Sequence, residues 1–122
     1  MITPDSAATG IREAMKVLEG RWKLLIIMNL FSNHVMRFSE LERSIPEVTQ
    51  KMLIQQLKAL EADGIVARTV YPQVPPKVEY SLTDEGKELC PALDALLVWA
   101  SKRNPQAEYG TYNPKYATKL NE

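Results

Sequence analysis

The side chains with the clearest chemical potential lie between residues 49 and 58. Apolar residues at Leu53, Leu57 and Leu60 follow the spacing of one buried helix face. The opposite face then presents Gln50, Lys51, Ile54, Gln55 and Lys58. A glutamine amide can pair with adenine, a lysine with guanine or phosphate, and an apolar side chain with a thymine methyl group. This face therefore has the chemistry to read the edges of DNA bases.

Any amphipathic helix needs a polar face towards water, so a polar face alone does not indicate DNA recognition. The neighbouring elements show which of the two roles this face has. Before this helix, apolar residues spaced by three or four over residues 11–32 predict a buried helical stripe: Ile11, Ala14, Met15, Leu18, Trp22, Leu25, Ile26 and Leu30. Gly20 is expected to divide it into two helices. A very short strand is expected at residues 35–38. The sequence from Ser39 to Glu42 fits a capping box that starts a short helix, which must end near Ser44 because Pro46 follows.

The segment after residue 48 predicts a second helix, a hairpin and a last helix. Thr49 can cap the second helix, and Gly64 can end it. Residues 66–71 and 78–82 then alternate with a period of two, as paired strands do, and a connection with three prolines joins them. Thr83 can cap a long last helix, which we expect to continue to Arg103.

This order of elements predicts a winged helix-turn-helix, a mainly α fold with a small β-hairpin. Such a fold places the second helix of its turn motif in the DNA major groove, and its hairpin loop on the backbone or the adjacent minor groove. Residues 1–103 form the expected DNA-binding and dimerisation domain, and residues 104–122 form a polar C-terminal tail. The N-terminal and last helices carry more apolar surface than one small bundle covers, which predicts a homodimer through residues including Leu93, Leu96, Leu97 and Trp99.

Chain length and charge are compatible with a DNA-binding domain but also leave an alternative. The chain of 122 residues has the size of one domain, and its 15 basic and 15 acidic residues give no net charge. Between Arg21 and Lys77, eight basic residues face five acidic ones, which is a modest excess. A winged-helix module that docks another protein without specific DNA binding is therefore the alternative. The N-terminus lacks the pattern of a secretory signal, and the most apolar stretch is too short to cross a bilayer, so we expect a cytoplasmic location.

Catalytic, cofactor and metal chemistry have no support in the sequence. Cys90 is the only cysteine and His34 the only histidine, so neither a disulfide nor a cysteine-based zinc site is expected. The sequence holds no glycine-rich phosphate loop, no recognisable pair of catalytic carboxylates and no cysteine-histidine pair. We expect no enzyme activity and no cofactor.

Several strings of residues together resemble the HxlR-type regulators, a winged-helix branch related to the MarR group. The resemblance covers about residues 9–100 and is carried by residues 20–26, 37–41, 51–53 with 56–57, and 60–66, and above all by the hairpin residues 71–83. It implies a homodimer built from the N-terminal and C-terminal helices that binds an inverted repeat of double-stranded DNA. It also implies control by a small signal, here an unidentified small-molecule effector. The implied DNA contacts are Thr49, Gln50, Lys51 and Gln55, the wing around Lys77, and Arg37 before the motif.

The chain departs from this family at one position. Several members of the family sense oxidants or aldehydes through a cysteine that precedes the family tryptophan, here Trp22, and the matching residue is Thr9. A hydroxyl group cannot form a disulfide. Cys90, in a helix with Leu89 and Leu93, is expected to lie in apolar surroundings that suppress the reactive thiolate. We therefore expect no response of DNA binding to thiol oxidants.

Overall fold

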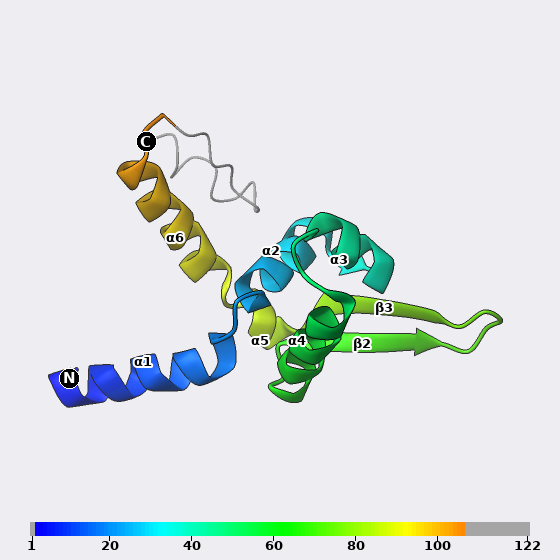
Figure 1. The fold of residues 1–122 in the computed structure, drawn as a ribbon. Helices are drawn as coiled ribbons and strands as arrows, with labels where there is room; N and C mark the ends of the chain where they lie inside the picture. The colour runs from blue at the N-terminus through cyan, green and yellow to red at the C-terminus, as the bar shows by residue number, and fades with distance from the viewer. Residues whose placement is uncertain (1, 107–122) are drawn as a thin grey trace.

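The computed structural model describes residues 2–106, and its secondary structure follows the expected order (Figure 1). The elements are α1 (Pro4–Leu18), α2 (Lys23–Asn33), β1 (Val35–Met36), α3 (Phe38–Ser44), α4 (Gln50–Ala62), β2 (Val66–Tyr71), β3 (Lys77–Leu82), α5 (Asp84–Lys87) and α6 (Cys90–Arg103). The expected polar tail, residues 104–122, lies outside the described residues from residue 107 onward.

A small antiparallel sheet joins the wing to the helices. Its strand order is β1-β3-β2, with Val35 opposite Ser81 and Val66 opposite Leu82. β2 and β3 continue beyond the body as a long hairpin, which is the wing (Figure 1). The two-residue strand β1 connects this hairpin to the start of α3.

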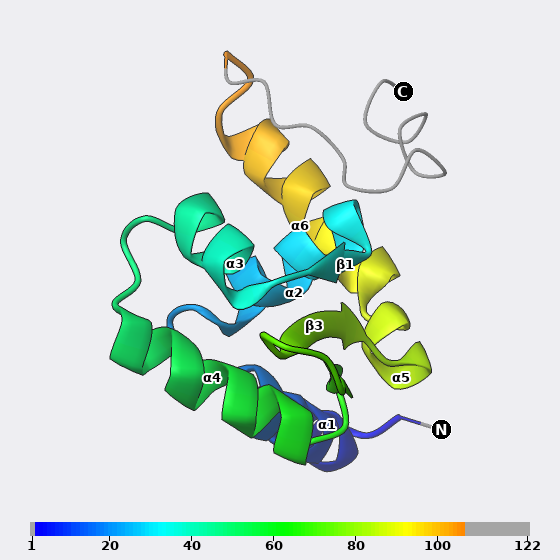
Figure 2. The ribbon, with the colours of Figure 1, turned by 90° about the vertical axis from the view of Figure 1, so that its right-hand side faces the viewer.

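The hydrophobic core lies where α2, α3 and α4 pack against the base of the sheet (Figure 2). Branched aliphatic side chains fill it because each helix turns one apolar stripe inward. The most completely buried members are Ile26, Ile27, Leu30, Leu41, Ile45, Leu53, Leu57, Leu60 and Val66. This core fixes the orientation of α4, so the side chains on the outer face of α4 project from a rigidly packed helix.

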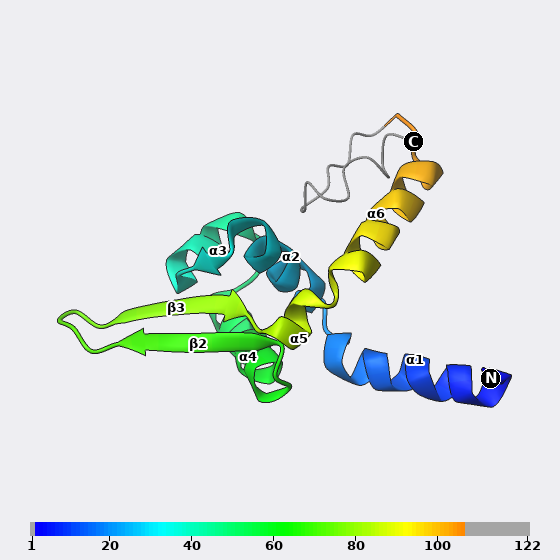
Figure 3. The ribbon, with the colours of Figure 1, turned by 180° about the vertical axis from the view of Figure 1, so that it is seen from behind.

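Two helices extend away from this core. α1 and α6 leave the body on the side opposite the wing and point in different directions (Figures 1 and 3). No residue of α1 is buried, and Ile11 and Met15 keep 65% and 46% of their surface exposed. The prediction that the whole stripe over residues 11–32 is buried is therefore wrong for Ile11 and Met15, because only the C-terminal end of α1, with Leu18, packs against the core. It is also wrong for Leu25 of α2, which is exposed.

The predicted capping of α3 is wrong in detail. The helix begins at Phe38, and Glu40 is its third residue rather than Glu42. The backbone N–H of Arg37 donates to Glu40 Oε1 at 2.8 Å, so the capping carboxylate is that of Glu40 and the N-cap is Arg37, two residues before the predicted Ser39.

The last helix is also not continuous. Thr83 caps a single turn, α5, and α6 begins at Cys90 with Pro91 in its first turn. Proline has no backbone donor, and its ring clashes with the carbonyl four residues earlier, here that of Lys87. The chain therefore changes direction between α5 and α6, and this change carries α6 away from the core (Figure 3).

Candidate nucleic-acid interface

Helix α4 is the second helix of the turn motif, and both of its ends are fixed as the sequence predicted. The backbone N–H of Met52 donates to Thr49 Oγ1 at 3.1 Å, which confirms Thr49 as the N-cap. Gly64, with φ of +75°, ends the helix in a left-handed conformation that suits glycine. The turn before α4 is held from inside by Ile45 and Val48, both buried.

The outer face of α4 is free of contacts with the core. Leu53, Leu57 and Leu60 point inward, and the residues on the opposite face are exposed: Gln50, Lys51, Ile54, Gln55 and Lys58. The structure therefore places on one surface the five helix residues that the sequence analysis selected. Arg37 is exposed as well, at the N-cap of α3.

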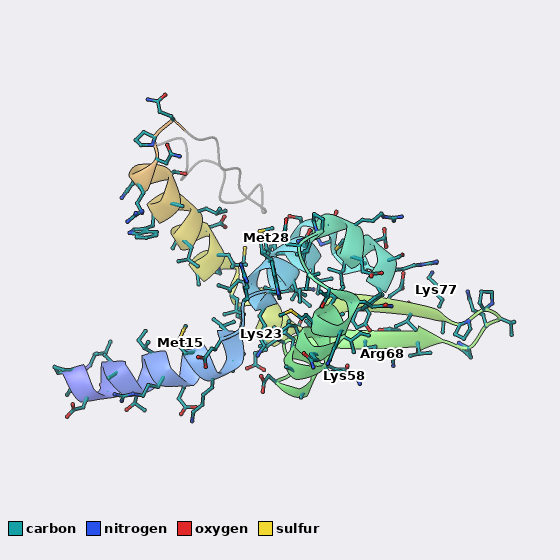
Figure 4. The ribbon with its side chains drawn as sticks, in the orientation of Figure 1. Met15, Lys23, Met28, Lys58, Arg68 and Lys77 are labelled. Atoms are coloured by element: carbon teal, nitrogen blue, oxygen red, sulfur yellow. The ribbon has the colours of Figure 1, made fainter. Side chains whose placement is uncertain are left out.

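A groove separates α4 from the wing and contains a basic residue that the sequence analysis missed. Its volume is about 320 Å³, and Lys58 from α4 and Arg68 from β2 both line it together with Glu61 and Tyr80. Figure 4 shows Lys58 and Arg68 close together where α4 meets the hairpin. The signal was present in the sequence, because Arg68 interrupts the apolar positions Val66 and Val70 of its strand.

The predicted wing residue, Lys77, is not a free charge. Its Nζ lies 3.7 Å from Glu79 Oε2 and 5.0 Å from the centre of the Tyr71 ring. A hydrogen bond to Glu79 and the negative charge of Glu79 raise the pKa of Tyr71 above its ordinary value. Lys77 is therefore partly neutralised within the wing, and a phosphate must compete with Glu79 for it.

The predicted dimerisation residues of α6 fall into two groups. Leu96 and Trp99 are 51% and 58% exposed, and Leu97 is half-buried, whereas Leu93 is buried in the core of its own chain. The exposed group lines an apolar groove of about 320 Å³ against Leu24, Leu25 and Met28 of α2. The structure thus brings Leu96, Leu97 and Trp99 together on an uncovered surface.

The single cysteine lies inside the protein. Cys90 is buried, and its thiol donates to Asp94 Oδ2 across 3.7 Å, so its surroundings are less apolar than expected. Burial and a neighbouring carboxylate both oppose formation of a thiolate. Within residues 2–106, no three histidine, cysteine, aspartate or glutamate side chains gather as metal ligands would. No helix of this described part is long and apolar enough to cross a bilayer.

The fold and the exposed face of α4 define a winged helix-turn-helix protein. A family model described as HxlR-like helix-turn-helix matches residues 17–108, and the chain belongs to this family. The HTH-type transcriptional regulator YkvN of Bacillus subtilis is 46% identical over 110 residues, which cover 87% of this chain and 92% of YkvN. The chain therefore belongs to a family of transcriptional regulators and not to a family of enzymes.

Solved structures agree with this assignment. The crystal structure of the HTH-type transcriptional regulator YtcD has a TM-score of 0.73 and 44% identity, covering 79% of this chain and 97% of that one. The redox regulator HypR in its reduced form has a TM-score of 0.72 and 42% identity, covering 80% of this chain and 94% of that one.

Proposed function

We propose that the protein is a sequence-specific regulator that binds double-stranded DNA as a homodimer. The observation that carries the proposal is the exposed face of α4, where a capped and rigidly anchored helix presents Gln50, Lys51 and Gln55 near its N-terminus. In this proposal α4 enters the major groove, the glutamines read base edges, and Ile54 contacts a thymine methyl group. Thr49, at the start of α4, and Arg37 contact the backbone.

The groove between α4 and the wing supports a second set of contacts. Lys58 and Arg68 lie on its two sides, so a phosphate backbone that follows the groove meets both cations. Lys77 extends this basic line along the wing (Figure 4). These contacts are independent of sequence, so they position the protein and do not select the operator.

The homodimer is proposed from the uncovered apolar faces. A helix of 15 residues with none of them fully buried, such as α1, is marginal in water by itself. A second copy offers a matching α1 and the apolar groove beside Trp99, and both copies become covered at once by twofold symmetry. The two α4 helices would then lie about 34 Å apart, one turn of DNA, and the operator would be an inverted repeat. We expect the protein to act in the cytoplasm.

Selection of DNA fragments by the purified protein, followed by footprinting of the most enriched sequence, tests the proposal. We expect a protected site with dyad symmetry and a dimer mass by light scattering at micromolar concentration. A monomer at that concentration would contradict the dimer, and a footprint without dyad symmetry would contradict the inverted repeat.

The same assay separates the protein-docking alternative. Specific DNA binding weakens log-linearly with rising salt, because each phosphate contact releases counterions. The substitution Gln55→Ala should reduce discrimination between operator variants, with Gln106→Ala as the matched control at an exposed glutamine beyond α6, away from α4 and the wing. Binding that is weak, equal for all duplexes and unaffected by Gln55→Ala would favour the docking module.

A further inference from the structure

A second cavity lies away from the proposed DNA surface, where α2 ends beside the sheet. Its volume is about 380 Å³, within the range of small-molecule sites. The buried side chains of Leu30 and Leu82 and the half-buried Phe31 form its apolar part. His34, Ser81 and Lys87 add polar groups at its rim. Figure 2 shows β1, β3 and α5 lying next to one another in this region.

The backbone at the cavity is strained. His34 has φ of 64° and ψ of −54°, a conformation that residues with a side chain rarely adopt. No other non-glycine residue among those described has a positive φ. Such strain costs about 1–3 kcal/mol and concentrates at ligand sites and switches. The proposed DNA surface does not explain this strain, because His34 lies at the C-terminal end of α2, outside the turn motif.

The charge at the rim indicates the kind of ligand. Lys87 supplies a cation, and His34 and Ser81 supply hydrogen-bond donors, while no acidic residue is among those that line the cavity in the described part of the chain. An apolar interior with cationic and donor groups at one edge suits a small organic carboxylate, whose body is buried and whose charged end stays at the rim.

The cavity also touches the parts that would move the wing. Val35 of β1 and Ser81 of β3 both line it and are paired with each other across the sheet. β3 is a strand of the wing, and β1 leads directly into α3 of the turn motif. A ligand held here contacts both elements, and it can therefore change their relative position.

We propose that this cavity is an effector site for a small organic carboxylate, held at its charged end by Lys87 and His34, and that its occupation changes the affinity for DNA. The regulatory part rests on the proposed DNA-binding function, whereas the binding part does not.

Binding is tested without DNA on the full chain. Backbone amide NMR spectra are recorded during titration with millimolar benzoate, and benzyl alcohol serves as the uncharged probe. We expect saturable shifts at the cavity residues with benzoate and weaker binding of benzyl alcohol. Lys87 is exposed, so Lys87→Gln keeps the fold and should raise the benzoate Kd about fivefold, whereas Lys102→Gln on α6 should leave it unchanged.

The failures of the two parts are distinguishable. The absence of saturable shifts, shifts that map elsewhere, equal binding of benzyl alcohol, or equal binding to Lys87→Gln would each overturn the site. The second arm measures operator affinity with and without benzoate, and we expect a change in the parent that Lys87→Gln reduces. Saturable benzoate binding with an unchanged operator affinity would overturn the effector role. Lack of any operator binding would refute the proposed function and leave the cavity result standing.

Discussion

The substitution Glu79→Gln should strengthen DNA binding. Glu79 holds Lys77 through an ion pair of 3.7 Å within the wing. Replacing the carboxylate with an amide of nearly the same shape frees the ammonium group for a phosphate. It also removes a negative charge from a hairpin that we place next to the DNA backbone.

The magnitude follows from the ion pair. Pairs near the surface stabilise by about 1 kcal/mol or less, so releasing Lys77 should tighten binding by at most about fivefold. A fully engaged phosphate contact should steepen the dependence of log K on log salt by about 0.9. The effect should be the same for operator and unrelated duplexes, because phosphate contacts carry no sequence information.

Fluorescence anisotropy with a labelled duplex, repeated at several salt concentrations, measures both quantities. Glu13→Gln is the matched control, because Glu13 pairs with Lys16 at 3.0 Å on α1, far from the wing (Figure 1). An NMR titration of the Tyr71 ring gives an independent check of the wing itself. Loss of the Glu79 charge should lower the raised pKa of Tyr71 towards its ordinary value of about 10.

Two results would show that Glu79 does not restrain a DNA contact of Lys77. If the pKa of Tyr71 falls as expected while affinity and salt slope remain those of the parent, the wing cluster is described correctly but Lys77 does not meet DNA. If Glu13→Gln tightens DNA binding as well, the effect of Glu79→Gln comes from the change in net charge and not from the release of Lys77.

Three further outcomes are expected. His34→Gly should stabilise the protein by about 1 kcal/mol in urea unfolding at fixed protein concentration, because relief of strain exceeds the entropy cost of glycine, and a loss of stability would contradict the strain. Lys77→Ala should weaken binding to all duplexes alike, whereas Gln55→Ala should relax base preference in competition assays. Mobility shifts with and without diamide should be identical; oxidant-induced release in the parent that Cys90→Ser abolishes would overturn the expectation of redox insensitivity.

Local signals in the sequence predicted the turn motif well. Thr49 can cap a helix because its side-chain oxygen reaches a backbone donor three residues later, and Gly64 can end one because it tolerates positive φ. Both signals depend only on near neighbours in the chain. The helix between them, with its inward leucines, therefore lies where its periodicity predicted, and so does the polar face opposite.

Features that depend on distant partners were missed. The periodicity of residues 11–18 indicated an apolar face but could not show that its own chain leaves Ile11 and Met15 of this face uncovered. Lys77 and Glu79 lie on the same side of one strand, yet the ion pair between them depends on side-chain orientation. Arg68 faces Lys58 only because β2 returns along α4. Pro91 was a local signal for the break before α6 that deserved more weight than the continuous apolar spacing.

In the proposed function, the exposed face of α4 selects a DNA sequence. The most direct test is the ratio of the affinities for the selected operator and for a scrambled duplex of the same length, measured at physiological salt. We expect a ratio of about a thousandfold or more, which falls sharply in the double variant Gln50→Ala/Gln55→Ala. Equal affinities for the two duplexes, or a ratio that the double variant leaves unchanged, would contradict it.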